Sequence, residues 1–183
     1  LDAPKVPAIP RYQLEWGDEI ASGATADVHR GTWRGHAVAL KRFRTSALTA
    51  GETALFEEEA KQMSLLRHAR VLVLMGVCRE QQPPRYTLVT ELMERGSLHA
   101  LLHSGGAGGD APSRHMLRRI ALDVCEGVAY LHAMRTLHRD LKSPNVLVGA
   151  DGRAKLGDFG LSKTMGTIMS HVSAGGGGTF AWN

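Results

Sequence analysis

The stretch that decides the fold runs from Leu137 to Leu161 and reads LHRDLKSPNVLVGADGRAKLGDFGL. It holds two carboxylates, Asp140 and Asp158, and between them a lysine and an amide, Lys142 and Asn145. Short apolar runs flank this polar set. Because polar groups this dense are costly to bury unless they have partners or bind something, they indicate a binding site.

The same stretch can also be interpreted as a polar turn followed by a β-hairpin, with short strands at 146–148 and 154–156 around a Gly-Ala-Asp-Gly turn. A hairpin alone does not explain why Asp140 and Asn145 precede the first strand while Asp158 follows the second. Since an antiparallel hairpin brings its two ends together, we expect these three side chains to surround one point. Carboxylate and amide oxygens there suit a hard cation together with a phosphate.

HRDLKSPN followed by DFG resembles the catalytic loop and the metal-binding loop of eukaryotic protein kinases. The resemblance implies that Asp140 accepts the proton of the substrate hydroxyl and that Lys142 steadies the transferring phosphoryl group. It implies that Asn145 and Asp158 hold Mg²⁺, with ATP as the phosphoryl donor.

His138 has two interpretations. A catalytic base would need a nucleophile nearby. The resemblance instead implies a core residue that packs under Phe159, in a stack with Met63 and Leu74, and we favour this core role.

A lysine and a glutamate complete the catalytic set that the resemblance implies. Residues 38–43 (VALKRF) predict a strand, and residues 52–67 predict a helix with acids early and a base at its end. Lys41 resembles the family lysine that binds the α- and β-phosphates, and the F-x-x-E spacing from Phe56 selects Glu59 as the inward acid. A Lys41–Glu59 ion pair is then expected to position the lysine.

Residues 21–28 (ASGATADV) resemble the family's glycine-rich loop, G-x-G-x-x-G-x-V. Only Gly23 is retained, and Ala21 and Ala26 take the outer places. Since alanine does not readily adopt positive φ and its methyl keeps the backbone farther from phosphates, we expect a lower nucleotide affinity and rate. The resemblance implies a nucleotide site made of Ala21, Ser22, Gly23, Ala24, Thr25, Ala26, Val28, Ala39, Lys41, Thr90, Glu91, Met93 and Leu147.

The fold that the resemblance implies is α+β, a bilobal protein kinase-like fold. Residues 1–13, with three prolines, are expected to form a linker or poorly ordered tail. Residues 14–91 are expected to form the N-lobe, a five-stranded antiparallel sheet with one helix. Residues 92–183 are expected to form a partial C-lobe with the hinge, the first helices, the catalytic loop, DFG and the start of the activation segment. Because the sequence ends before an A-P-E motif, we expect this piece alone to be weakly active or inactive.

Several hydroxyl side chains follow DFG in the segment that resembles an activation segment, and an upstream kinase is a possible partner for them. Arg139 is the natural partner for a phosphate on this segment. The candidate phosphorylation sites, which the sequence does not distinguish, are Ser162, Thr164, Thr167, Ser170 and Ser173.

The composition and charge of the chain limit the classes of protein to which it can belong. The 183 residues are 43% hydrophobic and 22% charged, which is ordinary for a soluble globular chain. The net charge of +4 is mild and both signs are interspersed, so no nucleic-acid partner is expected. No apolar run approaches the roughly 18 residues of a membrane span. We expect Cys78 and Cys125 to be buried, reduced thiols, which favours a cytoplasmic or nuclear setting.

Three motifs, DLKSPN, RGTWRG–VALKRF and GTFAW, resemble tyrosine-kinase-like Ser/Thr kinases of the Raf-like or MAP-kinase-kinase-kinase type. The expected function is ATP- and Mg²⁺-dependent phosphorylation of Ser and Thr hydroxyls of a protein substrate in intracellular signalling. One alternative is a pseudokinase, a nucleotide-binding scaffold module, which Ala21 and Ala26 favour slightly. A small-molecule kinase is disfavoured because the chain has no GxxxxGK[ST] loop.

Overall fold

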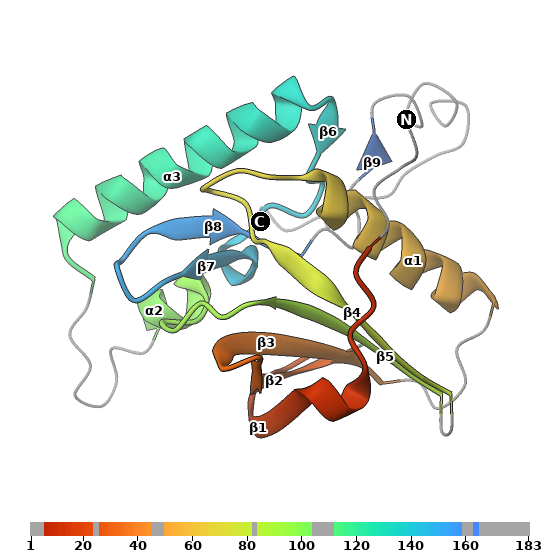
Figure 1. Ribbon diagram of the computed structural model, residues 1–183. Helices are drawn as coiled ribbons and strands as arrows, with labels where there is room; N and C mark the ends of the chain where they lie inside the picture. Colours follow the sequence, from red (N-terminus) through yellow and green to blue (C-terminus); the bar gives the residue numbers. More distant parts are fainter. Residues whose placement is uncertain are drawn as a thin grey trace. The chain divides into compact units, whose positions relative to one another are not determined.

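Figure 1 shows the computed structural model of the chain, which describes residues 6–23, 26–44, 50–81, 84–103, 112–158 and 163–164. The chain divides into two compact units, each described below by itself. The first comprises residues 1–67 and 72–92, and the second comprises residues 68–71 and 93–183.

The first unit is built on a five-stranded sheet in which every pairing is antiparallel. Its spatial order is β1-β2-β3-β5-β4, and one helix, α1 (Ala50–Leu65), completes the unit. The predicted N-lobe architecture is therefore confirmed. The strands are β1 (Leu14–Ser22), β2 (Ala26–Trp33), β3 (His36–Phe43), β4 (Leu74–Gln81) and β5 (Pro84–Glu91).

A two-residue turn joins β2 to β3. Its residues, Arg34 and Gly35, have φ of 52° and 78°, the positive values that tight hairpin turns with the native strand twist require. Nothing lies within 4 Å of a Cβ placed on Gly35. Glycine is therefore suited to this position by its backbone freedom and not by lack of space.

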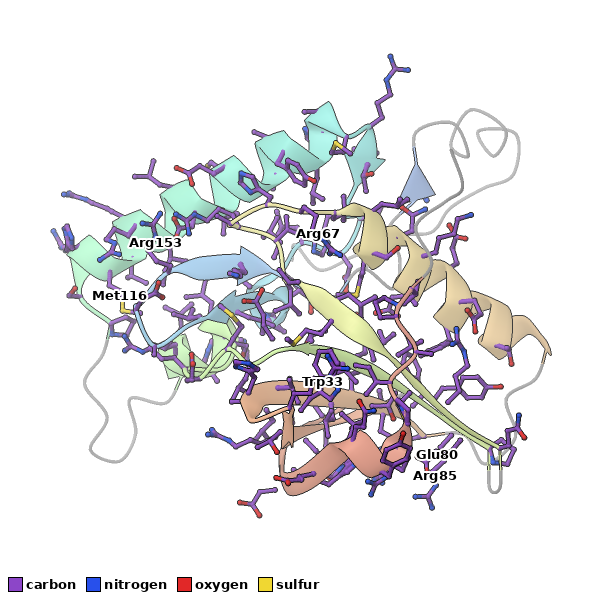
Figure 2. The ribbon with its side chains drawn as sticks, viewed as in Figure 1. Trp33, Arg67, Glu80, Arg85, Met116 and Arg153 are labelled. Carbon is purple, nitrogen blue, oxygen red and sulfur yellow. The ribbon has the colours of Figure 1, made fainter. Side chains whose placement is uncertain are left out.

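The two faces of the sheet carry different side chains, because successive side chains of a strand point to opposite faces. One face carries an apolar cluster against which Trp33, labelled in Figure 2, is packed. The register pairs Val28 with Lys41 and Ala39 with Thr90 on the opposite face, so these four nucleotide-site candidates are separated from that cluster. The apolar cluster consists of Ile9, Leu14, Val38, Leu40, Cys78 and Val89.

Helix α1 is fixed to the unit by its aromatic residue. The Phe56 ring is 1% exposed and meets the rings of Phe43 and Tyr86 edge-on, with centroids 5.4 and 5.1 Å away. Such pairs add about 0.5–1.5 kcal/mol beyond the burial of their area. Further along the helix, Met63 is 2% exposed, so one face of α1 is buried from Phe56 onward.

The N-terminal segment departs from the expected tail. The amide of Val77 donates to the Pro7 carbonyl and the Ile9 amide donates to the Val77 carbonyl, both at 2.8 Å, so residues 7–9 pair in parallel with the edge strand β4. The Ile9 side chain is 3% exposed. A Cβ on Gly76 would lie 2.6 Å from the Pro7 carbonyl oxygen, so this close approach requires glycine. A short 3₁₀ turn at Arg11–Gln13 then leads into β1.

The apolar run from Val71 to Cys78 does not form one continuous strand. Strand β4 begins at Leu74, while Val71 forms an isolated bridge with Leu156, and the Leu156 amide donates to the Arg70 carbonyl at 2.9 Å. The run is divided because Val71, its first residue, pairs with Leu156 in the second unit, and β4 begins only at Leu74. The His68 ring, stacked on Tyr130 at 4.6 Å, also belongs to that unit.

The second unit holds its short strands against a long helix, α3 (Arg114–Ala133). The Ser113 side chain caps this helix by accepting a hydrogen bond from the Met116 amide at 3.2 Å, as Ser does at N-cap positions. Figure 1 shows the β7–β8 hairpin lying along α3. The other elements are α2 (Leu98–His103), β6 (Thr136–Leu137), a 3₁₀ turn at Ser143–Asn145, β7 (Val146–Val148), β8 (Ala154–Leu156) and β9 (Lys163–Thr164), which pairs with β6.

One cysteine prediction is correct and one is wrong. Both thiols are free, but Cys78 is buried and Cys125 is exposed. Burial raises the pKa of the Cys78 thiol. The buried positions of α3 include Asp123 and Gly127, and the 3.6-residue period turns Cys125, between them, to the outside. None of the described helices is long and apolar enough to cross a membrane.

The structure predicts that the N-terminal segment stabilises the first unit. Replacing Ile9 with Ala removes a buried aliphatic side chain and should lower the free energy of unfolding by about 2–5 kcal/mol. Urea denaturation measures this change. Tyr12→Ala is the matched control, since Tyr12 is 84% exposed and its loss should stay within about 0.5 kcal/mol. Equal effects of the two substitutions would contradict the packing of this segment.

Candidate functional site

The first unit brings Lys41 and Glu59 together. Lys41 Nζ lies 3.0 Å from Glu59 Oε1, and their side chains are 23% and 7% exposed. The ammonium also lies over the Phe43 ring, 5.4 Å from its centroid. The ion pair expected from the F-x-x-E spacing is therefore present. Because the acid is nearly buried, the pair fixes the direction of the lysine more than it stabilises the fold.

The glycine-loop candidates lie at the tip of the β1–β2 hairpin. Ser22 pairs with Asp27, and the Gly23 amide donates to the Ala26 carbonyl at 2.9 Å, closing the tip. Ala26 is buried while Ser22 and Gly23 are exposed. Like these, Ala21 is exposed, whereas Ala24 and Thr25 lie outside the described residues.

The remaining nucleotide candidates are divided between the units. In the first unit, Thr90 is buried and donates from Oγ1 to the Glu91 carbonyl at 3.2 Å. The Glu91 carboxylate accepts a hydrogen bond from the Val73 amide at 2.8 Å, a side-chain contact that sequence reasoning did not foresee. In the second unit, the Met93 carbonyl accepts from Gly96 at 3.0 Å, and Leu147 bridges to Ser97.

A compact polar cluster in the second unit centres on Asp140. Asn145 Nδ2 donates both to the Asp140 carbonyl at 2.8 Å and to its Oδ2 at 2.9 Å. Lys142 Nζ lies 2.8 Å from the same Oδ2. The Asp140 side chain is 12% exposed and that of Lys142 is 41% exposed. One carboxylate oxygen is thus held by an amide and an ammonium, which orients the carboxyl group.

The β7–β8 hairpin brings Asp158 back to this cluster. Val146 pairs with Leu156, and just beyond that pair the Gly157 amide donates to the Asn145 carbonyl at 2.9 Å. Asp158 follows directly, exposed and with φ of 58°. Arg139, next to Asp140, has φ of 63°. Non-glycine residues in this region carry strain that the surrounding structure must hold, and such strain gathers at functional sites.

His138 is a buried part of this arrangement. Its ring is 5% exposed, and Nε2 lies 2.9 Å from the Gly157 carbonyl oxygen. Burial lowers the pKa of His138, although the hydrogen bond to Gly157 and the nearby charges of Asp140 and Asp158 oppose this shift. The imidazole is therefore neutral near pH 7 and binds the end of the hairpin. The core position that we favoured is confirmed, while Phe159 lies outside the described residues.

The donor atoms fit a hard cation. Asn145 directs its amide nitrogen to Asp140, which leaves its oxygen for a metal ion, and Asp158 supplies an exposed carboxylate. Mg²⁺ characteristically takes one or two protein oxygens and completes its shell with phosphate and water. Within the described ranges, no cluster of three His, Cys, Asp or Glu side chains suited to a metal ion is found.

A buried carboxylate that sequence reasoning missed supports the hairpin. Asp123, on α3, is 2% exposed. Asp123 Oδ1 lies 2.7 Å from Arg153 Nη2 and 2.9 Å from Arg70 Nε. Asp123 Oδ2 accepts a hydrogen bond from the Ala154 amide at 2.8 Å. Figure 2 shows Arg153 between the hairpin and α3. The sequence could have indicated this burial, because Asp123 is four residues before Gly127 and lies on the same buried face of α3.

Comparison with known proteins gives a consistent result. Residues 14–182 match the family model described as protein tyrosine and serine/threonine kinase. In Arabidopsis thaliana, the probable serine/threonine-protein kinase SIS8 is 39% identical over 90% of this chain and 16% of its own length. Serine/threonine-protein kinase CTR1, from the same plant, is 39% identical over 92% of this chain and 20% of its own length. The chain therefore spans about a fifth or less of these relatives.

Asp123 gives a test of how the hairpin is supported. Asp123→Asn leaves the guanidinium groups of Arg70 and Arg153 without their shared buried carboxylate, so the free energy of unfolding should fall by about 3–5 kcal/mol. Glu126→Gln removes the exposed partner of the same Arg70 and should cost under about 1 kcal/mol. Denaturant unfolding of both variants measures the difference. Similar losses in the two would show that Asp123 has no special structural role.

Proposed function

This chain belongs to the protein tyrosine and serine/threonine kinase family, and we propose that it transfers the γ-phosphate of ATP to Ser and Thr hydroxyls of a protein substrate. The observation that carries the proposal is the cluster in which Asn145 and Lys142 hold one oxygen of Asp140 at 2.9 and 2.8 Å. A carboxylate held in this way is oriented to accept a proton, and phosphoryl transfer depends largely on such positioning.

In the proposed mechanism, Asp140 accepts the proton of the substrate hydroxyl as that oxygen attacks the γ-phosphorus. The bond from the γ-phosphorus to the bridging oxygen breaks in the same step, and ADP leaves. Lys142, exposed by 41% and in contact with Asp140, stabilises the charge on the transferring phosphoryl group. Since Asn145 occupies one oxygen of Asp140 with its amide, it also keeps the carboxylate in the direction of the incoming hydroxyl.

The ion pair of the first unit has a complementary task. Lys41 binds the α- and β-phosphates of ATP, and Glu59, 3.0 Å from its ammonium, holds the lysine in place for them. Val28, Ala39 and Thr90 share a sheet face with Lys41 and line the nucleotide site in this proposal. The backbone of Glu91 and Met93 binds adenine.

Magnesium is the proposed cofactor. Asn145 and Asp158 would hold the ion, which supplies charge neutralisation on the β- and γ-phosphates. The positive φ of Asp158 fixes the direction in which its carboxylate leaves the hairpin, so the strain at this residue is consistent with a metal-binding role.

Preference for Ser and Thr is supported by two observations. Lys142 stands in the DLK-x-x-N pattern, which resembles that of Ser/Thr kinases, and the relatives named above are serine/threonine-protein kinases. We place the activity in intracellular signalling in the cytoplasm, with the nucleus as the other setting. An upstream kinase acting after DFG is part of the proposal. Among its candidate sites, Thr164 lies in β9, and Ser162, Thr167, Ser170 and Ser173 lie outside the described residues.

A pseudokinase remains the second candidate, and one specific observation favours it. Ala21 and Ala26 stand where the family has glycines, which increases the distance from backbone to phosphate. The two candidates differ in one property, since a scaffold has no need of the Asp140 carboxylate for its function.

The test is transfer of labelled γ-phosphate from ATP to Ser-, Thr- and Tyr-containing peptides, measured in a chain that extends past Asn183 and in the 183-residue chain. We expect Ser and Thr peptides to be labelled, with weaker labelling by the shorter chain.

Asp140→Asn should lower the rate by at least about 100-fold, the lower range for loss of a general base, while Mg²⁺–ATP still binds. Asp151→Asn, in the exposed hairpin turn, is the control. Nucleotide binding without any transfer by the extended wild-type chain would favour the pseudokinase.

A further inference from the structure

The tip of the β1–β2 hairpin is tied to the end of β3 by a side chain that the proposed function does not use. Arg44 directly follows β3. Its Nε and Nη2 donate to Asp27 Oδ1 at 2.9 and 2.6 Å, and Nη2 also donates to Ser22 Oγ. The Ser22 hydroxyl donates to the same Asp27 oxygen at 3.1 Å. One guanidinium therefore joins the ends of three strands, β1, β2 and β3.

Asp27 and Arg44 each stabilise the charged form of the other. The hydrogen bonds from Arg44 lower the pKa of Asp27, and those to Asp27 raise the pKa of Arg44. The Asp27 carboxylate is 13% exposed, while the arginine side chain is 45% exposed. The pair is thus charged at neutral pH, and its geometry is that of a charge-assisted contact and not of a chance encounter of two long side chains.

The contact lies just beyond an irregular part of the β1–β2 ladder. The register of β1 and β2 shifts between Trp16 and Glu19 and again between Glu19 and Ala21, so the strands reach the tip with interrupted pairing. Irregular pairing weakens the ladder that would otherwise hold the tip. Beyond this point, Ser22 pairs with Asp27, the two residues that Arg44 holds.

The contact is on the opposite face of the sheet from Val28, Ala39, Lys41 and Thr90. Asp27 pairs with Arg42, whereas Val28 pairs with Lys41, and successive side chains of a strand point to opposite faces. Arg44 therefore reaches the loop from behind, and its contacts are with loop side chains. This location makes it a positioning residue and not a ligand of the phosphates.

We propose that Arg44 is a positioning residue that holds the nucleotide loop in one arrangement before the nucleotide binds. At the two sides of the loop, Ala21 and Ala26 do not readily adopt the positive φ that glycine allows. A loop that is ordered in advance loses less entropy when it binds. The Ser22–Asp27–Arg44 contact then compensates for part of the affinity that the missing glycines cost. This inference rests on the proposed function for its nucleotide and on the structure alone for the ordering of the loop.

The first measurement does not require activity. Hydrogen exchange of the amides of residues 21–28, in the chain extended past Asn183 and without nucleotide, should become about 2–5-fold faster in Arg44→Gln, the range expected for loss of a partly exposed ion pair. Asp27→Asn should have a similar effect. Arg34→Gln is the control, since Arg34 lies at the other end of the β2–β3 hairpin, over the Trp33 ring. Unchanged exchange in Arg44→Gln would overturn the proposal.

The second measurement links the loop to the nucleotide. The dissociation constant of a fluorescent ATP analogue with Mg²⁺ should rise about 2–5-fold in Arg44→Gln, and Arg44→Lys should recover part of this loss because it keeps the charge but not the fork. The double variant Asp27→Asn/Arg44→Gln should lose no more than either single variant, since both remove one interaction. Additive losses would contradict a shared contact. Faster exchange with an unchanged dissociation constant would overturn the positioning role, whereas failure of the wild-type chain to bind the analogue would count against the proposed function itself.

Discussion

The closure of the β7–β8 hairpin is the constraint on which the polar cluster around Asp140 depends. The Gly157 amide donates to the Asn145 carbonyl at 2.9 Å, and His138 binds the carbonyl of Gly157 at the same distance. These two bonds hold the residue before Asp158 against the loop that carries Asp140 and Asn145. Because Asp158 and Arg139 have positive φ, the local backbone does not favour this arrangement by itself. The surrounding hydrogen bonds and the buried imidazole compensate for that strain.

The hairpin depends in turn on a buried charge. Asp123 is almost fully enclosed, and a single carboxylate in such a place is stable only if cations and amides satisfy it. Arg153 from the hairpin and Arg70 from the segment 68–71 both supply this. Such networks contribute little net stability compared with apolar packing, and we infer that their value here is to fix one register of the hairpin on α3. In the second unit, the buried Asp123 thus supports the β7–β8 hairpin, and the hairpin supports the polar cluster around Asp140.

The sequence was sufficient where local rules decide the structure. The Lys41–Glu59 pair follows from a strand, a helix and a short spacing, and the hairpin follows from its turn residues. The sequence was insufficient where contacts between distant residues determine the structure. The prolines near Ile9 are typical of a linker, yet pairing with β4 and the missing side chain of Gly76 bury that isoleucine. Cys125 has apolar neighbours in sequence, but the phase of α3 exposes it. The ion pairs of Asp123 join residues that no local pattern relates.

The central claim is that the hairpin gathers Asn145 and Asp158 into a site for a divalent cation accompanied by nucleotide. The most direct test is the affinity for Mn²⁺, followed by its electron paramagnetic resonance signal, with a saturating non-hydrolysable ATP analogue. The account predicts that Asp158→Asn weakens Mn²⁺ binding by about tenfold or more, and that Asp151→Asn, in the exposed turn of the same hairpin, binds as the wild type does. Equal Mn²⁺ affinity in the wild type and in Asp158→Asn would contradict it.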